Sequence, residues 1–260
     1  GGAVIEIAVA AARAAGEIQR RYWGGTFSVR HKGGVDLVTE VDLACEEEIR
    51  EVLARLAPGT AMLGEETGSS GRGADRWVVD PLDGTTNFAH GYPAFCVSIA
   101  WEQAGETVLG VVYDPTRDEL FQAERCRGAR RNGAGIRVSP TTVLADSILA
   151  TGFPYDRASN PRNYDEFRHL TQRTQGVRRS GSAALDLAYV ACGRLDGFWE
   201  PGLQPWDVAA GCLLVTESGG TVSGLGGGRF TPYDGDVAAS NGPLHPALLK
   251  ALAGATRNSP

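Results

Sequence analysis

Two aspartates three residues apart, Asp80 and Asp83, are the part of the sequence best suited to chemistry. They follow residues 77–79, an apolar stretch typical of a buried strand. Two nearby carboxylates in a partly dry site repel each other and lose hydration, and a hard divalent cation relieves both costs. Magnesium prefers carboxylate oxygens, water and phosphate oxygens as ligands. The pair therefore predicts a magnesium site at the end of a strand.

The residues around this pair favour a sharp turn. Because Pro81 has no amide hydrogen to donate to a sheet, we expect strand pairing to end there. Gly84 permits a tight turn, Thr85 can open a short helix, and the amides of both could hold the oxygens of a phosphate. The pattern Asp-x-x-Asp-Gly by itself would also fit a structural turn followed by a helix cap. The full run of residues 80–88 is far more specific for a metal site than this short pattern.

Two further acidic segments could supply partners for the aspartate pair. Glu65 and Glu66 come directly after the apolar residues 61–63, and a solvated acidic turn is the alternative interpretation. Asp207 lies in the first turn of a helix, where a negative charge is also favourable on electrostatic grounds alone. Each segment by itself is a weak signal. Together they place acids at the ends of elements, which is where metal sites are commonly assembled.

The composition fits one large globular domain or two closely packed half-domains. The chain has 260 residues, of which 42% are hydrophobic and 22% charged, values close to the globular average. The net charge of −6 argues against a broad surface for nucleic acid or anionic membranes. An anionic substrate remains compatible with this charge, because bound cations can invert a local field.

Several function classes lack their sequence patterns. The five cysteines show no Cys-x-x-Cys pair and no zinc spacing with histidine, so we expect reduced, buried thiols in a cytoplasmic protein. The apolar runs are shorter than a membrane span, so we expect no membrane partner. Neither nucleotide-binding glycine motifs nor a Gly-x-Ser-x-Gly nucleophile motif occurs. The arginines at 125, 127, 130 and 131 indicate the tip of a hairpin rather than a nucleic-acid surface.

The periodicity of the apolar residues predicts alternating helices and strands. We expect helices over residues 4–22, 39–56, 163–173, 183–191, 208–216 and 245–252, with Thr39 as the N-cap of the second. We expect strands over residues 61–63, 77–79, 95–101, 108–113, 119–124, 147–150, 197–199 and 237–239. Residues 104–138 favour an antiparallel meander, and the polar residues 139–142 a boundary between segments 1–141 and 142–260. The pattern indicates an α+β or mixed α/β fold built of layers.

Six runs of residues together resemble the signatures of the inositol monophosphatase family. They are residues 32–42, 64–66, 80–88, 179–184, 196–200 and 205–211. The resemblance extends over nearly the whole chain, and no catalytic position is broken. It implies a homodimer with the layered αβαβα sandwich of the sugar phosphatases, the type shared by inositol monophosphatase and fructose-1,6-bisphosphatase. The first segment would carry most metal ligands, and the second the substrate wall.

The resemblance implies two or three magnesium ions in each active site. The first ion would be held by Glu65, Asp80 and the carbonyl of Leu82. The second would be held by Asp80, Asp83 and Asp207, and a looser third ion would involve Glu65. Bridging by Asp80 fits two metals about 4 Å apart.

The resemblance also assigns catalytic roles. It implies direct attack on phosphorus by a metal-activated water, without a covalent phosphoenzyme. Thr85, paired with Asp42 or Glu65, would orient and deprotonate this water. A capping box with Thr39 is the alternative role for Asp42. Lys32 and Glu66 are assigned to a mobile active-site loop, although a surface turn would also explain Lys32 beside its two glycines.

The substrate wall rests on the resemblance as well. The residues assigned to it are Asp83, Gly84, Thr85, Gly181, Ser182, Ala183, Glu200 and Asp207. Glu200 is the most specific of these, since an acid can accept two hydrogen bonds from hydroxyl groups, although an ordinary acid at a strand end is the alternative. The alternative role for Ser182 is the N-cap of the following helix.

These assignments predict a magnesium-dependent phosphomonoesterase, an inositol-phosphate phosphatase that hydrolyses myo-inositol 1-phosphate or a similar polyol monophosphate and is sensitive to lithium. Glu200 and residues 181–183 favour inositol over the substrates of sibling phosphatases, which are histidinol phosphate, fructose 1,6-bisphosphate and 3′-phosphonucleotides. A regulatory protein that binds RNA or the transcription machinery is the alternative from a different class. We expect a small phosphorylated polyol as the partner, with no nucleic acid.

Overall fold

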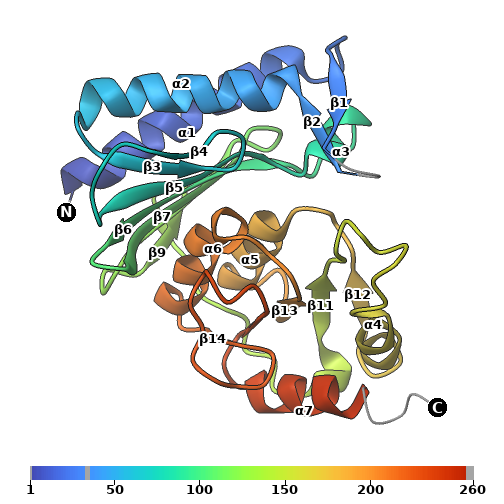
Figure 1. Ribbon diagram of the computed structural model, residues 1–260. Helices are drawn as coiled ribbons and strands as arrows, with labels where there is room; N and C mark the ends of the chain where they lie inside the picture. The colour runs from blue at the N-terminus through green and yellow to red at the C-terminus, as the bar shows by residue number, and fades with distance from the viewer. Residues whose placement is uncertain (1, 33–35, 256–260) are drawn as a thin grey trace.

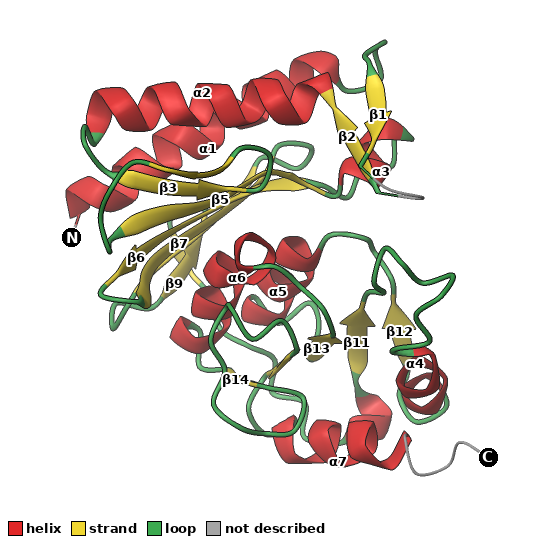
Figure 2. Ribbon diagram, viewed as in Figure 1, coloured by secondary structure: helices red, strands yellow, loops and turns green. Residues whose placement is uncertain are grey.

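The computed structural model describes residues 2–32 and 36–255 and shows five alternating layers of helices and sheets (Figure 1). The helices of these layers are α1 (Gly2–Tyr22), α2 (Glu40–Leu56), α4 (Tyr164–Thr171), α5 (Ala183–Ala191), α6 (Pro205–Glu217) and α7 (His245–Ala255). Helices α1 and α2 cover one face of a large sheet, and α5 and α6 separate it from a smaller sheet (Figure 2). Helices α4 and α7 cover the outer face of the smaller sheet. The predicted αβαβα sandwich is therefore confirmed.

The large sheet has eight strands. They are β3 (Ala61–Gly64), β4 (Gly68–Ser70), β5 (Arg76–Asp83), β6 (Cys96–Gln103), β7 (Glu106–Asp114), β8 (Glu119–Glu124), β9 (Ala129–Arg131) and β10 (Ala134–Gly135). Their order is β10–β9–β8–β7–β6–β5–β3–β4, with β3 and β5 parallel and the other neighbours antiparallel. Strands β7 to β10 form the predicted meander.

The smaller sheet has five strands and lies in the second half of the chain. They are β11 (Ile148–Thr151), β12 (Gly176–Arg178), β13 (Gly197–Glu200), β14 (Thr221–Ser223) and β15 (Val237–Ser240). Their order is β12–β11–β13–β15–β14, and β11 is parallel to both of its neighbours. The remaining elements are the antiparallel pair β1 (Val29–His31) and β2 (Leu37–Thr39), the short helix α3 (Thr85–Ala89) and the 3₁₀ turn Leu144–Asp146.

The alternation of side chains along β5 decides where the candidate acids point. Trp77 and Val79 pack into the core beneath α1 and α2, whereas Val78 packs into the core against α5 and α6. Because successive strand residues face opposite sides of a sheet, Asp80 falls on the same side as Val78. The carboxylate of Asp80 is thereby directed toward the layer that contains α6 and Asp207.

Two helix starts are fixed by local chemistry. Helix α2 begins after Thr39, whose side chain accepts hydrogen bonds from the amides of Val41 and Asp42, while Asp42 completes a capping box, so the predicted N-cap is confirmed. Helix α6 begins with Pro205, which lacks the amide hydrogen that would be unpaired at that position. As predicted, α6 is buried, and it approaches β7 so closely that a Cβ on Gly110 would lie 2.8 Å from the Cα of Ala210.

The expectation that pairing ends at Pro81 is wrong. Strand β5 continues to Asp83, which pairs with Cys96, and the register shifts between Asp80 and Asp83. A proline is tolerated at such a bulge because the ladder is already interrupted there. The carbonyl of Pro81 instead accepts a 2.8 Å hydrogen bond from the side-chain amide of the buried Gln19. The bulge turns the chain so that two residues three apart both reach the site.

Three further observations bear on the sequence predictions. The predictions missed the short strands β1, β2, β4, β12 and β14, which are too brief for a clear alternating pattern. All five cysteines are free, but Cys126 is exposed and Cys192 half-buried, so the expectation of uniformly buried thiols is wrong for these two. The division into 1–141 and 142–260 stays a prediction, because α5 and α6 pack against both sheets.

Candidate active site and metal centre

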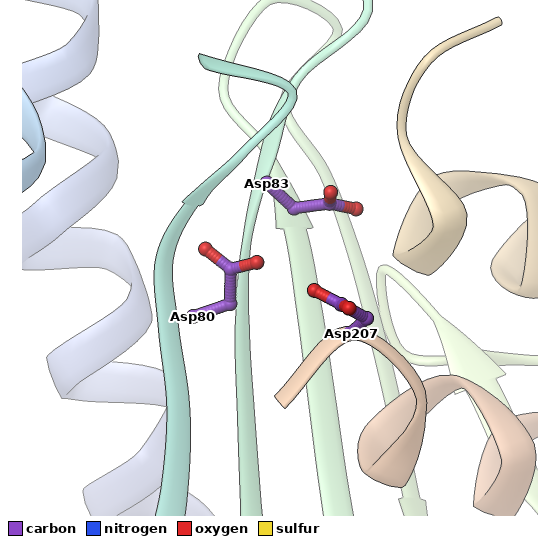
Figure 3. Close-up of side chains that lie close together, drawn as sticks. All are labelled: Asp80, Asp83 and Asp207. Atoms are coloured by element: carbon purple, nitrogen blue, oxygen red, sulfur yellow. The ribbon is translucent and has the colours of Figure 1, made fainter. Parts of the chain in front are cut away.

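Three aspartates from two distant segments meet in one place. Asp80 and Asp83 come from the end of β5, and Asp207 comes from the first turn of α6. One carboxylate oxygen from each lies within 4.8 Å of the other two, and Figure 3 shows the three side chains converging on a common space. Asp80 is 1% exposed and Asp83 is 9% exposed. The predicted pairing of the two β5 acids with Asp207 is thus present in the fold.

Burial and mutual repulsion make these acids hard to ionise. Burial raises the pKa of Asp80 well above its usual range, and the charges of Glu65, Asp83 and Asp207 raise it further. Burial followed by the charge of Asp83 has the same effect on the pKa of Asp207. Burial raises the pKa of Asp83 to about 6, although hydrogen bonds to its carboxylate act in the other direction. A cation among them would favour all three ionised forms.

The chemistry of this donor set fits a hard divalent cation. Carboxylate oxygens, a backbone carbonyl and water are the ligands that magnesium prefers, and a site without histidine or thiolate donors does not favour zinc. The three members of this cluster, all within the described part of the chain, offer only carboxylate oxygens as ligands. The residues that would hold metal are therefore Asp80, Asp83 and Asp207, with Glu65 and the Leu82 carbonyl nearby.

Glu65 lies at the edge of this cluster, where Lys32 neutralises it. The amide of Glu65 donates to the carbonyl of Val79, which fixes the residue beside β5. The ammonium of Lys32 lies 3.0 Å from a carboxylate oxygen of Glu65 and 2.6 Å from one of Glu66. The side chain of Glu66 is 4% exposed, so a solvated acidic turn does not describe it. Burial raises the pKa of Glu66 to about 7.

Lys32 and Glu66 were assigned to a mobile loop. The structure places Lys32 on the wall of the active-site cavity, and Glu66 reaches that wall through its ion pair with Lys32. The two glycines that suggested mobility, Gly33 and Gly34, lie outside the described residues. The mobility of this loop therefore stays a prediction.

Asp42 makes the contacts that both of its possible roles require, while its catalytic role stays a prediction. Its Oδ2 accepts hydrogen bonds from the amide and hydroxyl of Thr39, at 2.7 and 2.5 Å, which is the capping box of α2. Its Oδ1 accepts a 2.7 Å hydrogen bond from the hydroxyl of Thr85. The same hydroxyl lies 3.0 Å from the carbonyl of Leu82. Asp42 is fully buried, and this burial raises its pKa.

A glycine is required where the chain turns from β5 into α3. Gly84 has a φ of 94°, in the left-handed region, and an added Cβ would lie 2.7 Å from the carbonyl oxygen of Ala94. The first amides of any helix lack an intrahelical acceptor. Gly84 and Thr85 line the cavity at this point, and the binding of phosphate oxygens by their amides stays a prediction.

A cavity of about 540 Å³ joins the acids to the predicted substrate wall. Among the residues assigned from the sequence, its lining includes Lys32, Glu65, Asp80, Leu82, Asp83, Gly84, Thr85, Gly181, Ser182, Ala183, Glu200 and Asp207. Asp42 and Glu66 do not line it, and they contact it through Thr85 and Lys32. The fold thus brings residues of both halves of the chain to one cavity.

Glu200 is held against a glycine that the sequence interpretation missed. An added Cβ on Gly152 would lie 2.2 Å from Oε1 of Glu200, so any side chain there would displace the carboxylate. Glu200 is 9% exposed, and among the described residues no donor is bonded to it. Burial raises its pKa well above the usual range, and the charge of Asp186 raises it further. An unpaired, buried acid that lines a cavity is unlike the ordinary strand-end acid of the alternative interpretation.

Ser182 is the N-cap of α5 and also lines the cavity, while its binding of substrate stays a prediction. Its hydroxyl oxygen accepts a hydrogen bond of 3.4 Å from the amide of Leu185, as the N-cap of α5. Its hydroxyl donates a 2.6 Å hydrogen bond to Asp83. Other lining residues carried no sequence prediction, and they are Asp36, Thr151, Gly152, Phe153, Pro154, Tyr155, Asp156, Arg179, Asp186, Pro201, Gly202, Leu203, Gln204 and Trp206. Of these, Asp186 had a usable signal, because it follows Ala183 by one helical turn.

Comparisons with known proteins agree with this geometry. The model of the inositol monophosphatase family matches residues 3–259. The chain is 49% identical over 253 residues to an inositol-1-monophosphatase of Synechocystis sp., covering 96% of this chain and 88% of the relative. It is 48% identical to the Nus factor SuhB of Pseudomonas aeruginosa, covering 96% and 95% of the two chains. The structure of an inositol monophosphatase from Anabaena superposes with a TM-score of 0.89 at 47% identity, covering 96% of this chain and 95% of that one.

A five-layered sandwich with an acidic cluster in its central cavity defines a class of metal-dependent phosphatases. The chain belongs to the inositol monophosphatase family. The resemblance stated from the sequence is thus confirmed.

Proposed function

We propose that the protein is a magnesium-dependent phosphomonoesterase that hydrolyses myo-inositol 1-phosphate or a similar polyol monophosphate to the free polyol and phosphate. The observation that carries this proposal is the convergence of Asp80, Asp83 and Asp207, with oxygens within 4.8 Å of one another. Their pKa values are raised by burial and like charge. Such a cluster is costly to ionise without a cation and well suited to bind one.

The chemistry supplied by bound magnesium would be activation of the attacking water and neutralisation of charge on the phosphate and the leaving oxygen. The chain's own residues would position the reactants. Thr85 directs its hydroxyl hydrogen toward Asp42 at 2.7 Å, so its oxygen is free to accept a hydrogen bond from the attacking water. Asp42 is held by Thr39 on its other oxygen and would take up the proton that passes through Thr85.

The far end of the cavity supports a polyol as the leaving group. Glu200 presents a buried carboxyl group to which no residue in the described part of the chain donates, and such a group is satisfied by hydroxyl groups of a ligand. The glycine at position 152 makes room for that carboxylate. This wall favours a polyol phosphate over sibling substrates that lack hydroxyl groups at that place.

The proposal is tested by measuring phosphate release with a substrate panel. The panel contains myo-inositol 1-phosphate, histidinol phosphate, fructose 1,6-bisphosphate and a 3′-phosphonucleotide, each with magnesium and with excess chelator. We expect the highest kcat/KM with myo-inositol 1-phosphate, loss of turnover in chelator, and recovery with added magnesium. Turnover that survives complete chelation would contradict the metal mechanism, and a strong preference for another substrate would contradict the polyol assignment.

A second candidate function comes from the names of relatives. The Nus factor SuhB relatives of Pseudomonas aeruginosa and Escherichia coli are 48% and 45% identical to this chain. The surface gives less support to RNA binding, because arginines of the basic segment are paired with acids. Arg125 forms an ion pair with Glu106, and Arg131 lies 3.6 Å from Glu119. An RNA pull-down at increasing salt tests this role. We expect no salt-sensitive retention of RNA.

Three other predictions belong with the proposed function. We expect a homodimer, a cytoplasmic location and inhibition by lithium. No helix among the described residues is long and apolar enough to cross a membrane. Light scattering would test the dimer.

A further inference from the structure

Asp186 is a buried acid in the active-site cavity, and the proposed catalytic mechanism gives it no role. Asp186 is 3% exposed, and it lines the same cavity as the three aspartates of the metal cluster. It follows Ala183 by three residues on α5. Residues with this spacing lie on one face of a helix, and Ala183 lines the cavity too. Asp186 is therefore presented to the cavity by the same helical face.

One oxygen of Asp186 is fixed and the other is free for a ligand. The hydroxyl of Ser180 donates to Oδ1 of Asp186. Ser180 is itself anchored, since its carbonyl accepts a 2.7 Å hydrogen bond from the side chain of Asn87. No other residue in the described ranges donates to the Asp186 carboxyl group. Since buried polar oxygens are nearly always bonded, the second oxygen is left for whatever occupies the cavity.

Glu200 is the second acid on this wall with an oxygen to which no described residue donates a hydrogen bond. It is 9% exposed, lies against Gly152, and has no hydrogen-bond donor among the described residues. The two acids are near enough for the charge of Asp186 to raise the pKa of Glu200, after the larger effect of burial. Arg179 lines the cavity beside them but forms an ion pair with neither within the described part of the chain. The wall therefore carries two buried carboxyl groups whose hydrogen-bonding capacity the described residues do not fill.

We propose that Asp186 is a specificity-determining residue that acts together with Glu200, each binding a different hydroxyl group of the substrate. The inference rests on the proposed phosphatase function and deepens it. It limits the substrate class to phosphomonoesters whose alcohol part carries at least two further hydroxyl groups. A site built to bind hydroxyl groups rejects a ligand that lacks them, because its own buried groups are then left unpaired.

The state of these acids favours hydroxyl groups over an ammonium group as their ligand. Burial raises the pKa of Asp186 to about 8, so near neutral pH its carboxyl group holds a proton that it can donate. A hydroxyl group can accept that hydrogen bond and can donate one to a carboxyl oxygen of Glu200, whereas an ammonium group can only donate. Arg179 already supplies positive charge at this wall, which lowers the pKa of both acids.

The experiment compares three substrates that differ at the end remote from phosphorus. They are myo-inositol 1-phosphate, phenyl phosphate, which has no further hydroxyl group, and 2-aminoethyl phosphate, which carries an ammonium group. The variants are Asp186→Ala and, as a matched control, Asp146→Ala, which removes an exposed acid on the 3₁₀ turn. Kinetics are measured with saturating magnesium, and thermal melts in chelator establish that each variant is folded.

We expect wild type to prefer myo-inositol 1-phosphate. For Asp186→Ala we expect KM for this substrate to rise about tenfold, with kcat/KM for phenyl phosphate within about twofold of wild type and Asp146→Ala unchanged throughout. An equal loss on all substrates, or a wild-type preference for 2-aminoethyl phosphate, would overturn the inference while leaving the phosphatase function intact. Failure of wild type to hydrolyse any of the three would instead overturn the proposed function and the inference with it.

A second variant covers the case in which Asp186→Ala does not fold. Ser180→Ala leaves both acids in place and removes the donor that orients Asp186. If Asp186 binds substrate, this variant should raise KM for myo-inositol 1-phosphate and leave phenyl phosphate nearly unchanged. An unchanged KM for the polyol phosphate in Ser180→Ala would count against Asp186 in the same way.

Discussion

Ser182 donates a 2.6 Å hydrogen bond to Asp83 and thereby joins the end of β5 to the start of α5. The amide of Ala184 donates to the same carboxylate oxygen at 2.8 Å. Asp83 is therefore both a candidate metal ligand and an acceptor at the N-terminus of a buried helix. Asp80 differs, since its carboxyl group accepts the amide of Leu82 at 3.0 Å and its side-chain partner is another acid, Glu65. The two neighbouring acids should consequently respond differently to substitution.

The first prediction concerns the link between Ser182 and Asp83. Ser182→Ala removes an N-cap and a hydrogen bond to a buried carboxylate, so we expect the free energy of unfolding in chelator to fall by about 1–3 kcal/mol. Urea unfolding followed by circular dichroism measures this change. Ser69→Ala, at an exposed position of β4, is the control and should change stability little. Equal stabilities for Ser182→Ala and wild type would contradict the structural half of the double role.

The second prediction concerns Glu200. Glu200→Gln keeps the shape of the side chain but replaces one carboxyl oxygen, a possible acceptor, with an amide group that can only donate, so kcat/KM for myo-inositol 1-phosphate should fall about tenfold or more. A substrate with no hydroxyl group near position 200, such as phenyl phosphate, should change far less. Steady-state kinetics with both substrates measure the ratio. A uniform loss on both would remove Glu200 from the specificity wall.

The third prediction is a pH dependence of stability that comes from Asp186. Its pKa is about 8 in the folded protein, against an ordinary value of 3.8. Between these values the native state holds a proton that the unfolded state has released, so stability is greatest at low pH and falls as pH rises through this window. The slope for one proton is at most about 1.4 kcal/mol per pH unit.

Asp186→Asn has no such proton to lose. In chelator, its unfolding free energy relative to wild type should therefore increase steadily from pH 5 to pH 8. Other buried acids contribute in the same direction to both proteins and largely cancel in the difference. Chemical unfolding across this pH range measures it, and a difference that does not vary with pH would contradict the assignment.

The fourth prediction is lithium sensitivity, which the family resemblance suggested. A small monovalent cation that prefers oxygen ligands could replace one magnesium at Asp80, Asp83 and Asp207 and slow the release of product. We expect uncompetitive or mixed inhibition at millimolar lithium, measured by initial rates at varied substrate concentration. Potassium at equal ionic strength is the control. Complete insensitivity to lithium would argue against this mode of ion replacement.

The sequence predicted those parts of the fold that depend on local chemistry. Thr39 caps α2, Pro205 opens α6, and the apolar residues before Asp80 form a buried strand, all because neighbouring residues suffice to specify them. Pro81 misled the prediction, since a missing amide hydrogen ends pairing in a regular ladder but is tolerated at a bulge.

Local sequence patterns could not predict the contacts between distant segments. The sequence named Asp83 and Ser182 as site residues, but nothing in their spacing indicated that they bond across 99 positions. Asp186 was missed because an acid on a helix usually faces solvent, and only the packing of α5 between two sheets buries it. Long-range contacts of this kind are decided by how the layers stack.

The central claim is that Asp80 binds metal for catalysis and is not a structural turn residue. Asp80→Asn is nearly isosteric and relieves repulsion with Asp83 and Asp207, so apo stability should stay unchanged or rise slightly. It should also lose more activity than any other single carboxylate change, because Asp80 is assigned to both metals.

Thermal melts of wild type and Asp80→Asn, each with magnesium and with chelator, test this claim most directly when turnover is measured on the same samples. Ligand binding to the native state raises its melting temperature. We predict that magnesium raises the melting temperature of wild type but has little effect on Asp80→Asn, which melts normally in chelator and shows almost no turnover. A variant that melts much lower in chelator, yet keeps wild-type turnover per folded molecule, would contradict the account.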